Sequence, residues 1–164
     1  MDRELDIIRR ILSAGRYAFV TTRTADGALH SRPLALLDRA DDDPDRFDGT
    51  LWFFTEDPSS KVADVAAHPE VNVAVGDGKG YLSMSGSASI ERDRERIDRL
   101  WNRFAEAYFP NGKDDPAVAL LRVEVGSIEY WDTDEAAPKK AFELAKGILT
   151  RRTPDLGDTG TVQL

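Results

Sequence analysis

The sequence contains no cysteine and only two histidines among its 164 residues. Without thiols it can form no disulfide, no cysteine nucleophile and no zinc–thiolate site. His30 and His68 belong to no His-x-x-x-His pattern and to no carboxylate–histidine cluster, which are the arrangements typical of catalytic metal sites. We therefore expect neither a metal centre nor cysteine-based chemistry.

Long apolar runs and long basic runs are also missing. No apolar segment approaches the ~18 residues that a membrane-spanning helix needs, and the opening residues MDRELDIIRRIL are charged and amphipathic, unlike a signal peptide. The formal charge of -8 and the pI of about 4.8 argue against nucleic acid or an anionic membrane surface as a partner. A reducing compartment suits a chain without cysteine, so we expect a cytoplasmic protein.

The length and the apolar content of 41% suit a single domain with a substantial core. We place this domain at residues 1–150 and a polar, loose C-terminal tail at 151–164. Apolar residues at helical spacing predict four helices, namely one at the N-terminus that ends before Gly15, one around 62–66, one across 97–108 and one from Pro138 to Ile148.

Alternating apolar and polar residues predict six strands, at 17–23, 29–38, 51–55, 71–75, 81–90 and 121–130. The segments ADG (25–27) and GDGKG (76–80) are typical hairpin turns, so the sheet should be mostly antiparallel. A change of parity near Gly126 and Ser127 indicates a β-bulge. The fold class is therefore mostly β with peripheral helices, and six strands in so short a chain close most economically into a small barrel.

An acidic segment, DRADDDPDRFDG (38–49), invites a calcium-binding interpretation. An EF-hand loop needs glycine at its sixth position and glutamate at its twelfth. Counting from Asp41 gives Arg46 and Trp52 at these positions, and counting from Asp43 fails in the same way. We interpret the segment as a solvated acidic loop.

Two segments about thirty residues apart suggest a binding site for an anion. Arg32 and Pro33 interrupt the strand LHSRPLALLD, although a buried arginine needs a partner and a strand proline belongs at an edge or a bulge. In FFTEDPSSK, a strand leads through a turn to a helix start that carries Ser59, Ser60 and Lys61. Free amides, hydroxyls and a cation suit a phosphate. The alternative is ordinary N-capping by one serine, which leaves the lysine unexplained.

Taken in order, nine segments resemble the split-barrel flavin-binding proteins related to pyridoxamine phosphate oxidase, and in particular their general-stress-protein branch. The resemblance covers roughly residues 3–133 and rests on HSRPL (30–34), LWFFT (51–55), SSKV (59–62), VNVAV (71–75), MSGSAS (84–89), LW (100–101), YFPNGKDDP (108–116), LLRVEV (120–125) and EYWD (129–132). No single segment is specific, whereas their order and spacing together are.

The resemblance implies a six-stranded antiparallel split barrel that forms a homodimer with two FMN sites at its interface. It assigns FMN contacts to the early arginine strand, to the aromatic–threonine strand end and to the serine–lysine helix start, which here are Arg32, Pro33, Leu34, Phe54, Thr55, Ser59, Ser60 and Lys61. The partner chain would close the site with Tyr81, Trp101 and Trp131. Each tryptophan fits a core or interface aromatic equally well.

Two departures from the oxidase pattern bear on activity. Leu37 stands where the oxidase has a lysine, and no histidine follows His68 to form the substrate-binding Arg-x-His motif. These departures argue against pyridoxamine phosphate oxidation itself. The resemblance then favours an FMN-dependent oxidoreductase with a small-molecule electron donor and acceptor, with a stress-related role. A flavin-binding or flavin-sensing protein without turnover, a deazaflavin-dependent reductase and a cofactor-free barrel stay open.

Overall fold

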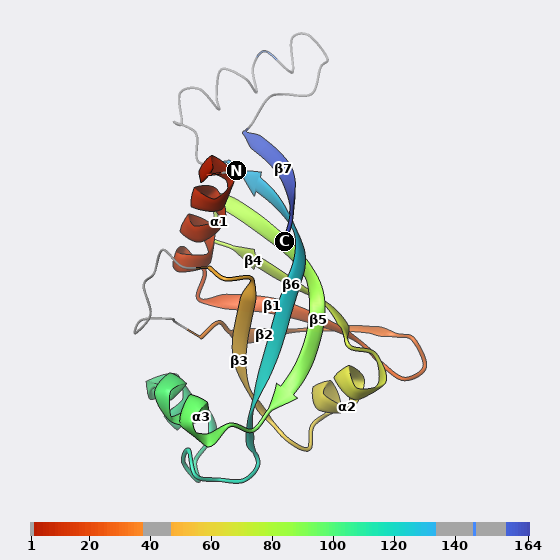
Figure 1. Cartoon of the computed structure of the whole chain (residues 1–164), viewed down its shortest axis with the longest axis vertical. Helices are drawn as coiled ribbons and strands as arrows, with labels where there is room; N and C mark the ends of the chain where they lie inside the picture. The colour runs from red at the N-terminus through yellow and green to blue at the C-terminus, as the bar shows by residue number, and fades with distance from the viewer. Residues whose placement is uncertain (1, 38–46, 134–145, 147–156) are drawn as a thin grey trace.

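A strongly coiled antiparallel sheet forms the framework of the computed structural model, which describes residues 2–37, 47–133, 146 and 157–164 (Figure 1). Its strands are β1 (Tyr17–Arg23), β2 (Leu29–Ala35), β3 (Thr50–Glu56), β4 (Glu70–Gly76), β5 (Gly80–Glu91), β6 (Val118–Asp132) and β7 (Asp158–Gln163). The first six are the predicted strands, bonded in the order β2-β1-β4-β5-β6-β3, and β7 pairs with β6. The prediction of a mostly β, antiparallel fold is confirmed.

The two end strands of this order, β2 and β3, meet at one place. The backbone N–H of Leu37 donates to the carbonyl of Trp52 at 3.2 Å, while β2 pairs along its length with β1. Within the described residues, no ladder joins β2 to β3. The sheet therefore curls into a barrel that is closed at one point and split elsewhere, with β2 as an edge strand.

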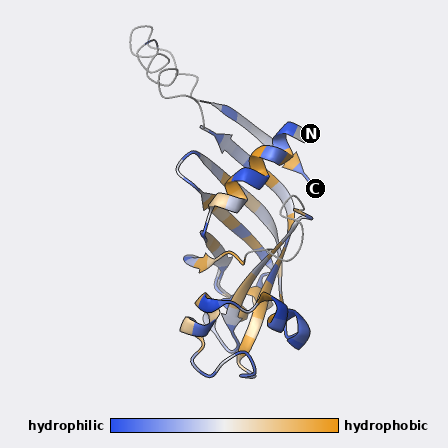
Figure 2. Cartoon of the chain, turned by 90° about the vertical axis from the view of Figure 1, so that its left-hand side faces the viewer, coloured by the Kyte–Doolittle hydropathy of each residue, from blue (hydrophilic) through white to orange (hydrophobic). Residues whose placement is uncertain are grey.

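The core lies inside this curl, because each strand turns alternate side chains inward. Ala18, Val20, Phe53, Val73 and Met84 are fully buried. The helix α1 (Asp2–Ala14) ends before Gly15, as predicted, and covers one end of the barrel with Ile8 and Ile11, both 0% exposed. Figure 2 shows apolar positions recurring along α1 between hydrophilic ones.

The long strands β5 and β6 run through the length of the molecule (Figure 1) and carry the predicted bulge. Ser85 lies opposite Ser127, whereas the next residue, Gly86, lies opposite Val125, so Gly126 is the extra residue. A side chain at Gly86 has no room, because an added Cβ would lie 2.1 Å from the carbonyl oxygen of Glu124. The parity change thus marks a true bulge.

The predicted continuous helix across 97–108 is wrong. Two short helices, α3 (Arg94–Leu100) and α4 (Arg103–Tyr108), occupy this region. The side-chain oxygen of Asn102 accepts a hydrogen bond from the backbone N–H of Ala105 at 2.9 Å and so begins a new helix. Apolar spacing alone did not reveal this break.

The predicted loose tail is wrong for residues 158–163, which form β7 against β6. Val162 lies opposite Ile128 and is only 5% exposed, so this strand extends the core. The acidic residues 38–46 and the predicted helix at 138–148, apart from Lys146, lie outside the described residues. None of the described helices is long and apolar enough to cross a membrane.

Candidate functional site

Arg32 lies on the inward face of the edge strand β2, in register with Val20. Its Nη1 donates to the hydroxyl of Thr22 at 2.6 Å, and its Nη2 lies 3.5 Å from the Oδ2 atom of Asp64. The Thr22 hydroxyl in turn donates to the same Oδ2 atom at 2.7 Å. Thr22 and Asp64 are 1% and 7% exposed. The three side chains, from β1, β2 and a helix, therefore form a closed polar ring.

This ring changes one expectation from the sequence. An inward arginine needs an anionic partner, and we expected a ligand phosphate to serve. The protein itself supplies an anion in Asp64, at 3.5 Å. Arg32 keeps further N–H donors, because a guanidinium carries five.

The helix α2 (Ser60–Ala67) begins beside this ring. Ser59 is its N-cap, and the serine hydroxyl accepts a hydrogen bond from the backbone N–H of Val62 at 3.4 Å, so the capping interpretation is confirmed. The Nζ of Lys61 donates to the hydroxyl of the buried Thr55 at 3.2 Å. Ser60, the first helical residue, is exposed. The helix start thus presents a hydroxyl beside a partly buried lysine.

Lys61 and Arg32 lie close enough to affect each other's charge. Burial, followed by the positive charge of Arg32, lowers the pKa of the Lys61 amine, and Glu56 opposes this shift. Within the described part of the chain, no carboxylate forms an ion pair with Lys61, and Asp64 is the one carboxylate that pairs with Arg32. Asp64 is ion-paired with Arg32 and Glu56 acts on Lys61 without an ion pair, so Arg32 and Lys61 bring two cations together in a chain of formal charge -8. Such a place favours an anion.

The two predicted aromatic contacts Phe54 and Trp101 lie in a separate apolar cluster. The Phe54 ring meets Trp101 edge-on at 5.4 Å between centroids and Phe109 at 6.1 Å. Leu37 is 6% exposed and belongs to the same cluster. A core role for Phe54 and Trp101 therefore accounts for their positions, and the place where the oxidase carries a lysine is buried in apolar surroundings here.

The remaining predicted residues lie on both faces of the sheet. Leu34 is partly buried and packs against the main core, whereas Pro33 is exposed on the outer face of the edge strand. Tyr81 and Trp131 lie opposite each other across β5 and β6, and they are 51% and 39% exposed. Their outward parity separates them from the inward-facing Arg32. The structure thus gathers Arg32, Thr55, Ser59, Ser60 and Lys61 but not the three partner-chain candidates.

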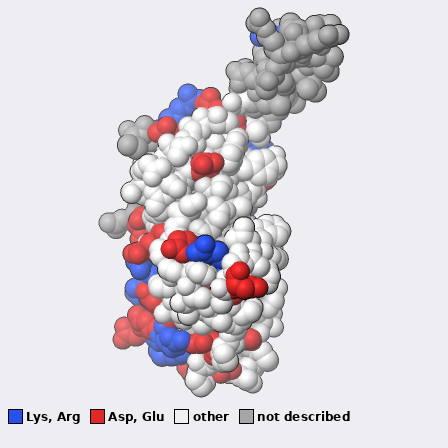
Figure 3. All heavy atoms as spheres, turned by 90° about the vertical axis from the view of Figure 1, so that its right-hand side faces the viewer, with Lys and Arg blue, Asp and Glu red and all other residues white. Residues whose placement is uncertain are grey.

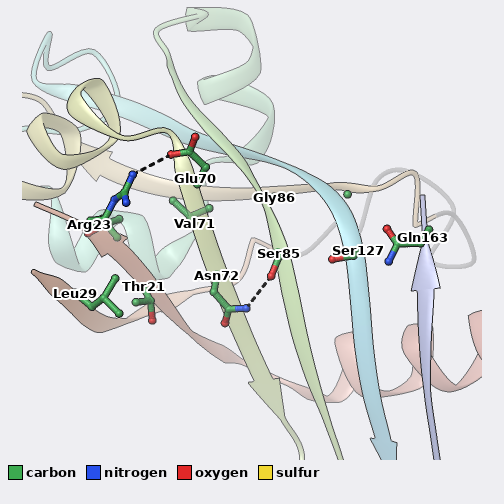
Figure 4. A pocket seen from close by; sticks show the side chains of 12 residues that line it. Thr21, Arg23, Leu29, Glu70, Val71, Asn72, Ser85, Gly86, Ser127 and Gln163 are labelled. Atoms are coloured by element: carbon green, nitrogen blue, oxygen red, sulfur yellow. Dashed lines mark hydrogen bonds and ion pairs between the residues drawn. The ribbon is translucent and has the colours of Figure 1, made fainter. Parts of the chain in front are cut away.

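An open groove of about 670 Å³ crosses the outer face of the sheet. Figure 4 shows that neutral polar side chains from several strands line it, among them Thr21, Asn72, Ser85, Ser127 and Gln163. The Asn72 amide donates to Ser85 at 3.3 Å, and Gly86 lines the groove at the bulge. On the side of the molecule away from α1, uncharged atoms make up most of the surface (Figure 3). Arg23 and Glu70 also line the groove, where they pair with each other at 3.8 Å (Figure 4), so the groove offers neutral polar groups and one exposed ion pair.

Sequence reasoning missed Thr22 and Asp64. The sequence could have indicated Thr22, because this polar residue has the same inward parity as the apolar residues Ala18 and Val20 of its strand. Asp64 had none, since an aspartate in a short helix is ordinarily solvated. Its burial depends on how α2 packs against β1 and β5, which the local pattern does not encode.

Comparison with known families places this geometry in context. The sequence model described as "Pyridoxamine 5'-phosphate oxidase like" matches residues 3–155, which is most of the chain. Protein bli-3 of Neurospora crassa is 26% identical over 164 residues, a match that covers 92% of this chain and 75% of that protein.

Solved structures give the same result for the fold. A protein from Jannaschia sp. CCS1, provisionally named general stress protein 26, superposes with a TM-score of 0.75 and 27% identity over 100% of both chains. The general stress FMN/FAD binding protein from Xanthomonas citri superposes with a TM-score of 0.66 and 26% identity, over 80% of this chain and 92% of that chain. Both likenesses cover most of this chain.

Proposed function

The chain belongs to the pyridoxamine 5'-phosphate oxidase-like family, and on this basis we propose that it is an FMN-binding oxidoreductase with a stress-related role. The observation that carries the proposal is the pair of cations, Arg32 on β2 and Lys61 on α2, beside the start of a helix. The general stress FMN/FAD binding protein from Xanthomonas citri supports a flavin as the ligand.

The residues fit the phosphate end of FMN. Lys61 is half-buried with a lowered pKa, so an anion beside it would relieve an unfavourable charge. The exposed Ser60 hydroxyl and the first amides of α2 add hydrogen-bond donors. Arg32 adds a planar guanidinium that is suited to phosphate oxygens.

The flavin ring would then lie along the edge of β2. Pro33 has no backbone N–H to leave unpaired at an edge, and Leu34 presents an apolar side chain on the same face as Arg32. A bound flavin supplies the redox chemistry, and the protein binds and orients it. Redox turnover at a bound flavin would require little acid–base catalysis by side chains of this protein.

We also propose that the active form is a homodimer in which the partner closes each flavin site. The exposed aromatic residues Tyr81 and Trp131 on the outer face support this proposal, because large exposed apolar side chains that gather on one face are typical of interfaces. In such a dimer, the tyrosine and the tryptophan of one chain would be available to the flavin of the other.

The cofactor is tested by titrating the purified protein with FMN and with a deazaflavin in parallel, followed by fluorescence quenching. We expect FMN to bind at micromolar or lower concentration, and tighter binding of the deazaflavin would replace the cofactor assignment. A folded protein that binds neither would overturn the proposal.

A flavin-binding protein without turnover is the second candidate. The burial of Leu37, where the oxidase carries a cation, favours it. Mixing the FMN-loaded protein with a nicotinamide donor and following loss of the flavin absorbance separates the two. Reduction followed by reoxidation with an added acceptor supports an oxidoreductase, whereas a flavin that stays oxidised supports a binding role.

A further inference from the structure

We propose that Asp64 is a positioning residue that fixes the guanidinium of Arg32 for an anionic ligand, both directly and through the hydroxyl of Thr22. The inference rests on the proposed function, because the ligand in question is the phosphate of FMN. It adds two residues, Asp64 and Thr22, that the family resemblance did not assign.

The hydrogen bonds of the ring have a defined direction. An ionised carboxylate only accepts, so the single proton of the Thr22 hydroxyl must be directed toward Asp64, at 2.7 Å. The lone pairs of that hydroxyl are then free for Arg32, whose Nη1 donates to it at 2.6 Å. The charge of Asp64 therefore determines which way the hydroxyl points and so what Arg32 can bind.

The distances indicate that Asp64 orients Arg32 through a long ion pair rather than through a short charged hydrogen bond. Nη2 of Arg32 is 3.5 Å from Oδ2 of Asp64, longer than a good charged hydrogen bond. The shorter contact, at 2.6 Å, joins Nη1 of Arg32 to the hydroxyl of Thr22, and Nη1 also lies 3.4 Å from the carbonyl oxygen of Val20. One side of the guanidinium is thus held by β1 and α2, and the other N–H groups stay available to a ligand.

Burial makes this arrangement stiff. Asp64 and Thr22 are 7% and 1% exposed, so water cannot readily replace either partner. A long arginine side chain ordinarily loses rotamer freedom when it binds a ligand, and prior restraint reduces that cost. Asp64 also lies three residues after Lys61 on α2, which links the position of Arg32 to that of the second cation.

The test compares Asp64→Asn with the wild type by titration with FMN and with riboflavin, which has the same ring but no phosphate. An asparagine amide can donate to Thr22 and turn its proton toward Arg32. We expect FMN affinity to fall about tenfold, the loss typical of a hydrogen bond to a charged group, with riboflavin affinity unchanged. Circular dichroism and thermal melting check that each variant is folded.

Further variants at Thr22 and Arg32 separate a positioning role of Asp64 from a general loss of structure. Thr22→Val should weaken FMN binding in the same direction, and Thr22→Ser, which keeps the hydroxyl, should restore it. In an Arg32→Ala background, Asp64→Asn should cause no further loss, because Asp64 acts through Arg32. The Thr22 variants give the same test if Asp64→Asn does not fold.

The outcomes distinguish this inference from the proposed function. A wild type that prefers FMN, together with an Asp64→Asn variant that binds FMN equally well or more tightly, overturns the inference alone and makes Asp64 a spectator or a competing anion. Additive losses in the double variant also overturn it. A wild type that binds FMN no better than riboflavin overturns both the inference and the phosphate site.

Discussion

The ammonium group of Lys61 is half-buried and lies near a second cation, the guanidinium of Arg32. Burial and then Arg32 lower its pKa from the ordinary value of 10.5. Between the lowered pKa and 10.5, the unfolded chain binds more protons than the folded one, so stability rises with pH across that interval. At neutral pH the charged lysine therefore costs stability, and an anionic ligand would offset this cost.

The first prediction concerns the pH dependence of FMN binding. Above about pH 8 the phosphate is fully ionised, so any further loss of FMN affinity relative to riboflavin reports on the protein. We expect the ratio of FMN affinity to riboflavin affinity to fall as pH rises toward 10.5, because Lys61 loses its proton. Both ligands share the same ring, so ring ionisation cancels in the ratio.

Lys61→Met is the matched control, since it keeps a long apolar stem without the charge. Its ratio of FMN affinity to riboflavin affinity should be lower than that of the wild type at pH 8 and should not change at higher pH. A wild-type ratio that does not change with pH, or a Lys61→Met ratio that falls like that of the wild type, would show that Lys61 does not contact the phosphate.

At this scale, residue types and spacing indicated the charged part of the site. Arg32 stood out because it interrupts a strand, and Lys61 because it follows a capping serine. The sequence could not show that Arg32 already contacts an aspartate, because Asp64 reaches it from a helix that begins 28 residues later. Long-range contacts between polar side chains depend on tertiary packing rather than on local pattern.

At the scale of elements, local sequence pattern again predicted some features and missed others. Strict alternation predicted both strands, and its interruption predicted the bulge at Gly126. The α3–α4 break escaped prediction, because apolar residues continue at helical spacing through Asn102, whose capping role depends on its backbone conformation. The strand β7 escaped as well, because DTGTVQ has a single strongly apolar residue, Val162.

The second prediction tests the bulge. Gly86→Ala should destabilise the fold by about 1–3 kcal/mol, as overpacking does, because its Cβ would meet the Glu124 backbone at 2.1 Å. Gly126→Ala is the control, since the nearest atom to its Cβ, the carbonyl oxygen of Ser85, is 3.9 Å away. Urea unfolding measures both variants, and equal stability losses would contradict this account of the bulge.

Among the residues that the structure describes, no helix covers one face of the sheet. On the outer side of the sheet, the register places Tyr17, Phe19, Tyr81 and Trp131 with outward parity, at 48%, 56%, 51% and 39% exposure. We interpret this face as the surface that a second copy covers.

The third prediction is that Phe19→Glu disrupts the proposed dimer, because it would bury a charge in the apolar interface that we propose. Losing a central aromatic contact should cost about 2 kcal/mol or more of association free energy, measured by sedimentation equilibrium across a range of concentrations. Phe104→Glu is the control, since Phe104 is 53% exposed on α4 and outside this face. A monomeric wild type, or a Phe19→Glu variant that stays dimeric, contradicts the proposal.

The central claim, that Arg32 and Lys61 hold the phosphate of FMN, is tested most directly by the preference for FMN over riboflavin in the wild type and in Arg32→Ala. Isothermal titration should show FMN bound more tightly by at least ~1.5–3 kcal/mol, the contribution of one charged hydrogen bond. Arg32→Ala should lose most of this preference and leave riboflavin affinity unchanged. Equal affinity of the wild type for the two ligands, or an Arg32→Ala variant that keeps the preference, would contradict the account.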